Sequence, residues 1–179
     1  MKPETTGSLP KQSVKAYIAA PLFNDAEKAF NLQLADVLAD VGISSYLPQR
    51  DGGEAAPLIR QGMDEHAVRQ RLFQGDVDAV RECDLFVMVL DGRVPDEGAC
   101  VELGMAHAFG KPCFGLQTDC RRFGGTDSNN LMIDYALSGG TSHAVPALLN
   151  TLTAYLADMM QNAPVTGPHV AATHRSTLA

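Results

Sequence analysis

The sequence has no long apolar run and little positive charge. Its longest uncharged apolar stretch, residues 85–90, is far short of the about 20 residues that span a bilayer. Acidic residues number 21 against 14 lysines and arginines, which gives a formal net charge of −7. No basic cluster is longer than Arg121-Arg122. The short apolar run predicts no membrane span. Because a negative field repels phosphate backbones, we also expect no nucleic-acid partner.

Cysteine is sparse, and its spacing suggests neither disulfides nor a metal site. The four cysteines include no C-x-x-C pair, and no two histidines have H-x₃-H spacing. The first residues also lack the basic and then apolar pattern of an export signal. We therefore expect reduced thiols in the cytoplasm and no bound metal.

The two commonest phosphate-binding loops are missing. The chain contains no Walker A sequence, and the turn after its first expected strand reads Ala-Ala-Pro-Leu-Phe instead of G-x-G-x-x-G. Loops of that kind cradle the phosphates of ATP and of dinucleotides. We therefore expect no cofactor.

The composition is that of one ordinary globular domain. The chain has 179 residues, of which 45 % are hydrophobic and 20 % charged. Both ends are rich in proline, threonine and glycine and show no apolar periodicity. We expect a flexible segment over residues 1–14, a folded domain over residues 15–160 and a flexible tail over residues 161–179.

Strand and helix patterns alternate within the domain. Apolar runs predict strands at residues 14–20, 43–47, 85–90 and 113–117, and a fifth apolar piece covers residues 131–137. Helical spacing predicts helices at residues 25–41, 63–83 (with a break near Gly75), 98–109 and 145–160. Asn24, with Glu27 three residues later, resembles a capping box at the start of the first helix. Residues 48–62 are expected to form a polar loop. This alternation predicts an α/β fold, a flavodoxin-like or Rossmann-like doubly wound sheet of five mostly parallel strands with helices on both faces. Ligands of such sheets bind at the carboxyl ends of the strands.

Two acidic residues lie on helix faces that should point inward. Glu102 shares its face with Met105, Ala106 and Phe109, and Asp76 shares its face with Ala79, Val80 and Cys83. A carboxylate on an apolar face is costly unless it is paired or functional. We expect Glu102 to be held ionised by the nearby helix start, as suits a nucleophile. Two inward acids beside one strand favour acid–base or glycosyl chemistry.

The order of these motifs resembles one enzyme family. The chain contains Tyr-Ile-Ala-Ala-Pro-Leu-Phe from Tyr17, then Asp76 eight residues before Asp84. It continues with Pro-Asp-Glu-Gly-x-x-x-Glu-Leu-Gly-x-Ala from Pro95 and Asn-Leu-Met from Asn130. Over about residues 15–140 this pattern resembles the nucleoside 2-deoxyribosyltransferases, although the segment between Phe23 and Asp76 matches only loosely.

The resemblance implies a flavodoxin-like domain that moves a 2-deoxyribosyl group between nucleobases with retention. Glu102 would be the nucleophile, Tyr17 would orient it, and Asp76 would be the acid–base. The expected substrates are a deoxynucleoside and a free nucleobase, with no cofactor. The substrate-binding residues would be Asp96 on a sugar hydroxyl, Phe23 and Gly98 within the matching motifs, and Asn130 and Met132 lent by a neighbouring subunit of a homo-oligomer.

Two alternatives remain open. A related group hydrolyses deoxynucleoside 5′-monophosphates on the same scaffold, with a serine where Asp96 stands. Because a carboxylate there would repel a phosphate, Asp96 favours a nucleoside, but the sequence does not decide between transfer and hydrolysis. A non-catalytic binding module is the other alternative, and it would have no reason to keep Tyr17, Asp76 and Glu102 together.

Overall fold

The computed structural model describes residues 14–53, 55–121 and 129–162. Most of the two segments expected to be flexible therefore lies outside the described residues. Within the described part, no helix is long and apolar enough to cross a membrane. The helix at the carboxyl end extends to Asn162, two residues into the segment expected as a tail.

A five-stranded, all-parallel sheet forms the centre of the molecule. Its strands are β1 (Val14–Ala19), β2 (Ile43–Tyr46), β3 (Leu85–Val89), β4 (Cys113–Leu116) and β5 (Thr141–Ser142). They lie in the order β2-β1-β3-β4-β5, which is the flavodoxin-like order. The predicted α/β fold is confirmed.

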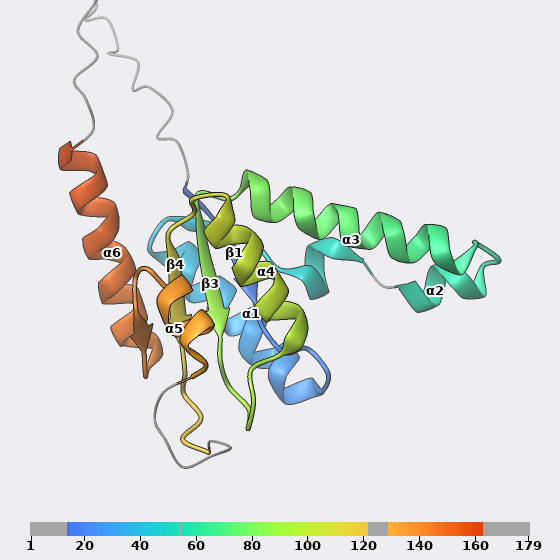
Figure 1. The fold of residues 1–179 in the computed structure, drawn as a ribbon, viewed down its shortest axis with the longest axis horizontal. Coiled ribbons are helices and arrows are strands. Elements are labelled where there is room, and N and C mark those ends of the chain that lie inside the picture. The colour runs from blue at the N-terminus through green and yellow to red at the C-terminus, as the bar shows by residue number, and fades with distance from the viewer. Residues whose placement is uncertain (1–13, 54, 122–128, 163–179) are drawn as a thin grey trace, which may run out of the picture.

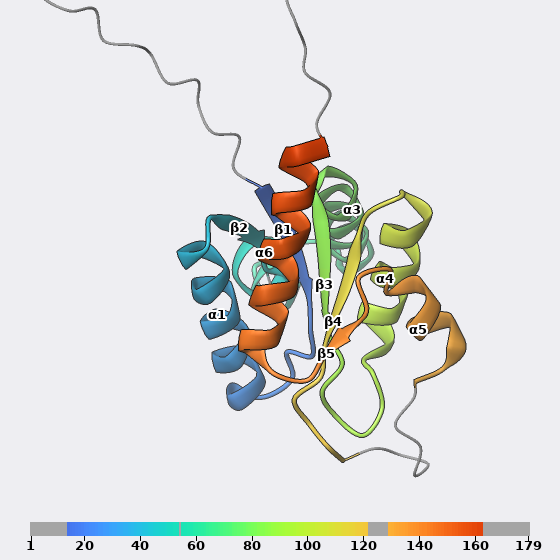
Figure 2. The same ribbon diagram turned by 90° about the vertical axis from the view of Figure 1, so that its left-hand side faces the viewer.

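Helices cover both faces of the sheet (Figure 2). One face carries α1 (Asp25–Asp40) and α6 (Val145–Asn162), whose leucines pack on the apolar side chains of β1 and β3. The other face carries α3 (Glu65–Glu82), α4 (Glu97–Ala108) and α5 (Leu131–Ala136). The core on this second face includes Tyr17, Phe86 and Leu103.

The start of α1 is fixed by the predicted capping box. The Asn24 side chain accepts from the Glu27 backbone N–H at 3.0 Å. The Glu27 carboxylate in turn accepts from the backbone N–H groups of Asn24 and Phe23. Two donors that helix formation leaves without partners are thus satisfied, and the loop after β1 is held against the helix.

The segment expected as a polar loop contains two short helical pieces. A π-helical turn, η1, covers Pro48–Gly52, and α2 covers Ala55–Arg60. The α2 helix packs on α3, and the two project sideways from the body (Figure 1). Both pieces are too short to show a helical repeat. The break expected near Gly75 is absent, because α3 runs through it without interruption.

The apolar piece at residues 131–137, the candidate for a fifth strand, is helical. It forms α5, and the fifth strand is instead the two-residue β5, which pairs with Gly115 and Leu116 of β4. A short apolar run cannot be assigned to strand or helix by periodicity. The signal for a helix was Asn130, whose side chain accepts from the Met132 backbone N–H and caps α5.

Two glycine-to-alanine substitutions test this packing. A Cβ added at Gly139 would lie 2.1 Å from the ring of Phe114, a buried core residue, whereas a Cβ at Gly75 would meet nothing within 4 Å. We expect Gly139→Ala to lower the free energy of unfolding by about 1–3 kcal/mol. Gly75→Ala should raise it by about 0.5–1 kcal/mol, because alanine is the better helix former. Urea denaturation measures both, and a wild-type midpoint for Gly139→Ala would contradict the packing of β4 against this turn.

Candidate active site

Three aromatic rings lie side by side across the sheet, on the face covered by α3 and α4. The strand register pairs Tyr17 with Tyr46 on one side and with Phe86 on the other. The Tyr17 ring stacks on both, with centroids 5.3 Å from Tyr46 and 5.5 Å from Phe86 and interplanar angles of 20° and 7°. Two phenols are therefore held next to each other on rigid strands.

The first phenol contacts the predicted nucleophile. The hydroxyl of the fully buried Tyr17 donates to Oε1 of Glu102 at 2.8 Å. Glu102 is partly buried on α4, facing the sheet as its helical spacing predicted. This hydrogen bond offsets part of the cost of removing the carboxylate from water.

The second phenol contacts the predicted acid–base. Tyr46 donates its hydroxyl to Oδ1 of Asp76, on α3, at 3.2 Å. The turn η1 closes over this pair, because a Cβ added at Gly52 would lie 3.1 Å from the Tyr46 hydroxyl and 3.3 Å from Asp76 Oδ1. Sequence reasoning missed both Tyr46 and Gly52. Only the alignment of β2 with β1 places these two residues at the site, and that alignment cannot be read from the sequence.

Burial sets the proton affinity of both carboxyl groups. Burial raises the pKa of Glu102 to about 7; the hydrogen bond from Tyr17 opposes this rise, and the charges of Asp76 and Asp96 add to it. Burial also raises the pKa of Asp76, against the lowering effect of its hydrogen bond from Tyr46. The expectation that the helix start holds Glu102 ionised is therefore wrong. Glu102 lies in the second turn of α4, beyond the first turn where that effect is felt.

The phenols respond to the same surroundings. Burial and the charges of Glu102 and Asp76 raise the pKa of Tyr17 far above its usual range. Burial, together with the hydrogen bond to Asp76 and that residue's charge, raises the pKa of Tyr46 to about 12. Both hydroxyls thus stay protonated at neutral pH and act as hydrogen-bond donors.

The amino end of α4 brings a third acid near Glu102. Asp96 caps the helix, since its Oδ2 accepts from the Ala99 backbone N–H at 2.8 Å. A Cβ added at Gly98 would lie 3.1 Å from the same oxygen, so glycine leaves room for the cap. Asp96 is near enough to raise the pKa of Glu102. The structure therefore brings together five of the residues singled out from the sequence: Tyr17, Asp76, Asp96, Gly98 and Glu102.

The other three predicted site residues, Phe23, Asn130 and Met132, take no part in these contacts. Phe23 is 75 % exposed in the loop after β1. Asn130 and Met132 are at the amino end of α5, where Met132 is 72 % exposed. In the described part of the chain, none of the three hydrogen-bonds to Tyr17, Asp76 or Glu102.

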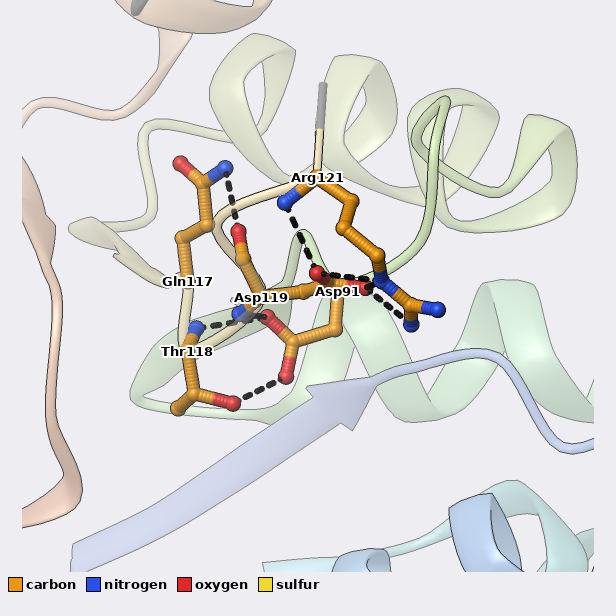
Figure 3. A network of polar contacts seen from close by, with 5 residues as sticks. All are labelled: Asp91, Gln117, Thr118, Asp119 and Arg121. Carbon is orange, nitrogen blue, oxygen red and sulfur yellow. Dashed lines mark hydrogen bonds and ion pairs between the residues drawn. The ribbon is translucent and has the colours of Figure 1, made fainter. Parts of the chain in front are cut away.

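A separate polar network ties two loops together at the carboxyl edge of the sheet (Figure 3). The Asp91 carboxylate, after β3, accepts from the backbone N–H groups of Thr118 and Asp119 and from the Thr118 hydroxyl. Asp119 is in turn paired with Arg121 at 2.7 Å. A cavity of about 440 Å³ adjoins this network and extends to α1, but Tyr17, Asp76 and Glu102 do not line it. The two acids of this network, Asp91 and Asp119, are already hydrogen-bonded or ion-paired within the protein. The cluster of phenols and carboxylates around Tyr17 is therefore the candidate active site.

The described side chains offer no evident metal site. Among them, no group of three or more histidine, cysteine, aspartate or glutamate side chains could hold a metal ion. All four cysteines are free thiols. The chemistry that the site residues themselves can supply is that of two carboxyl groups, each held by a phenol.

Two solved structures share this fold, and a third is less similar. A conserved protein from Enterococcus faecalis V583 is 25 % identical, with a TM-score of 0.64 over 79 % of this chain and 98 % of its own. The 2-deoxyribosyltransferase of Bacillus psychrosaccharolyticus is 23 % identical, with a TM-score of 0.63 over 76 % of this chain and 91 % of its own. The CMP N-glycosidase of Clostridium botulinum is 19 % identical, with a TM-score of 0.49 over 78 % and 98 %. No protein of curated function matches the sequence.

The family assignment comes from the sequence as a whole. The model of the nucleoside 2-deoxyribosyltransferase family matches residues 16–161. This range includes Tyr17 and all the other residues of the candidate active site. It extends beyond the segment in which we identified the resemblance. The chain belongs to the nucleoside 2-deoxyribosyltransferase family.

Proposed function

We propose that this protein is a nucleoside 2-deoxyribosyltransferase that works through a covalent intermediate on Glu102. The observation that supports this most directly is the 2.8 Å hydrogen bond from the Tyr17 hydroxyl to Glu102. This bond engages one oxygen of the carboxylate, and the other oxygen is the one proposed to attack. The family acts on nucleosides and nucleobases.

The first half of the reaction cleaves the donor. The ionised Glu102 attacks the anomeric carbon of the 2-deoxyribosyl group, and the N-glycosidic bond breaks. The leaving nucleobase takes the bonding electrons and a proton from the Asp76 carboxyl group. The sugar passes through a cationic transition state, which the nearby carboxylates stabilise.

The second half forms the product. The Asp76 carboxylate removes a proton from the incoming nucleobase, whose nitrogen attacks the anomeric carbon and expels Glu102. Two inversions give net retention. Burial raises the pKa of Asp76 above its usual value, which favours a group that must give a proton as well as take one.

Hydrolysis is the second candidate. If water replaces the incoming base, the same intermediate releases free sugar, and a nucleoside or a deoxynucleoside 5′-monophosphate N-glycosidase results. Asp96 favours the nucleoside, because its carboxylate near the site would repel a phosphate. Asp96 is also proposed to bind a sugar hydroxyl, and Phe23 and Gly98 to contact the substrate.

The proposed partner is a second copy of this chain. Asn130 and Met132 would reach the 5′ side of the sugar in the neighbouring subunit. The exposure of Met132 beside Leu131 and Tyr135, which are 65 % and 84 % exposed, supports this proposal. Large apolar side chains grouped on one short helix are typical of a contact surface.

Product analysis tests the proposed reaction. Incubation with a 2′-deoxynucleoside and a second free nucleobase should yield a new deoxynucleoside, which chromatography detects. Glu102→Ala should lower the rate by roughly three orders of magnitude or more, because the nucleophile is gone. Glu97→Ala, which removes an exposed acid from the same helix, is the matched control and should leave the rate unchanged. Free sugar as the sole product, or faster cleavage of a deoxynucleoside 5′-monophosphate, would replace the transferase with the N-glycosidase.

The pH dependence of donor cleavage tests the state of Glu102. With a 4-nitrophenyl 2-deoxyriboside, whose leaving group needs no proton, kcat/KM should fall about tenfold per pH unit below pH 7. The reason is that a nucleophile with a pKa of about 7 is protonated there. Tyr17→Phe removes a hydrogen bond that lowers this pKa, so the acid limb should move up by about one unit. A limb that stays in place or moves down would contradict the role of Tyr17.

Mixing inactive variants tests the shared site. Asn130→Ser keeps a residue that can cap α5 but removes the amide proposed to reach the neighbour. If Glu102→Ala and Asn130→Ser subunits exchange in a dimer, half of the molecules regain one working site. Activity should then recover to about a quarter of the wild-type value. No recovery between variants shown to exchange subunits would place Asn130 in its own subunit's site or in none.

A further inference from the structure

We propose that Tyr46 is a positioning residue for the reaction: its hydroxyl holds one oxygen of Asp76 so that the other faces the nucleobase. This inference rests on the proposed function, in which Asp76 carries the proton. It adds a residue from β2, which lies in the segment where the family resemblance is loose.

The contact between the two side chains is direct. The Tyr46 hydroxyl donates to Asp76 Oδ1 at 3.2 Å, and in the described part of the chain no other hydrogen bond reaches this carboxylate. An aspartate on a helix can turn about its side-chain bonds. A single donor on Oδ1 therefore selects one orientation and leaves Oδ2 for the substrate.

The donor is itself firmly held. Tyr46 closes β2, where the backbone register aligns it with Tyr17. Its ring stacks on the Tyr17 ring, and Lys15 Nζ lies 6.0 Å from its centroid. A positioning group on a rigid strand directs its partner more closely than one on a loop would.

Each of the two carboxylates accepts a hydrogen bond from a tyrosine hydroxyl. Tyr17 donates to Glu102, and Tyr46, stacked beside it, donates to Asp76. A hydrogen bond to the ionised form of a carboxyl group lowers its pKa, against the rise that burial causes. Tyr46 thus limits how tightly Asp76 holds its proton, as a group that must both give and take one requires.

Other charged or titratable groups face this pair from neighbouring elements. Lys15 and Tyr17 come from β1, Asp51 from η1 and Glu102 from α4. The hydrogen bond from Arg50 lowers the pKa of Asp51, so Asp51 contributes a steady negative charge. All of these groups remain in place when only the Tyr46 hydroxyl is removed.

Removal of the hydroxyl gives a direct test. In protein labelled with ¹³C-aspartate, NMR titration reads the pKa of the Asp76 carboxyl group, whose signal Asp76→Asn identifies by its loss. Tyr46→Phe should raise this pKa by roughly half a unit to one unit. Gly52→Ala, which crowds the same hydroxyl, should move it in the same direction. Tyr155→Phe, on α6 across the sheet, is the matched control and should leave it unchanged. An unchanged Asp76 pKa in Tyr46→Phe would overturn the proposal.

Kinetics separate the failure of this inference from that of the proposed function. In Tyr46→Phe, kcat for transfer should fall roughly tenfold, while KM for the donor stays within about twofold, because orientation is lost and binding is not. The limb of the pH profile that Asp76→Asn abolishes should move to higher pH. An active wild type with unchanged kcat and pH limb in Tyr46→Phe refutes the positioning role alone. A wild-type protein that neither transfers nor hydrolyses refutes the proposed function and, with it, the positioning role of Tyr46. The NMR titration still tests whether Tyr46 hydrogen-bonds to Asp76.

Discussion

The hydrogen bond from Tyr17 to Glu102 is the interaction on which the candidate site depends. A carboxylate that faces a sheet loses most of its water, and this loss must be offset by a donor. The donor here is a phenol at the centre of the sheet, 2.8 Å from the carboxylate oxygen. Because the phenol is fully buried between Tyr46 and Phe86, it cannot turn away from Glu102 without disturbing the core.

The parallel register makes this arrangement possible. Tyr46, Tyr17 and Phe86 occupy aligned positions on β2, β1 and β3, so their rings lie on one face of the sheet. A slip of one residue between two of these strands would send a ring to the other face. The strand order therefore fixes both the fold and the pair of donors, and α3 and α4 complete the site by presenting one carboxylate each.

Sequence reasoning could find the residues whose signal is local. The helical spacing around Glu102 and Asp76 predicted that both acids point inward, and Asn24 with Glu27 predicted the start of α1. Tyr46 could not be found in this way, because its role depends on which residue of β1 it aligns with. The pKa of Glu102 could not be predicted either, since it depends on how much water the surrounding elements exclude.

Short helices and strands could not be predicted from the sequence either. A π-helical turn of five residues, a helix of six and a strand of two contain too few repeats to distinguish one period from another. The turn η1 nevertheless closes over Asp76 and Tyr46 through Gly52. The part of the chain that was hardest to predict thus contributes to the wall of the site.

The balance of charge around the two carboxyl groups narrows what the site can stabilise. The charges that act on Glu102 are those of Asp76 and Asp96, and both raise its pKa. Repulsion between these charges favours a state in which one of the carboxyl groups is protonated. The proposed reaction needs such a state, with Glu102 ionised and Asp76 protonated. The groups that donate hydrogen bonds to these two carboxylates are the phenols of Tyr17 and Tyr46. A neutral nucleoside that develops positive charge on its sugar would relieve the repulsion among these acids, whereas a substrate that develops negative charge would increase it.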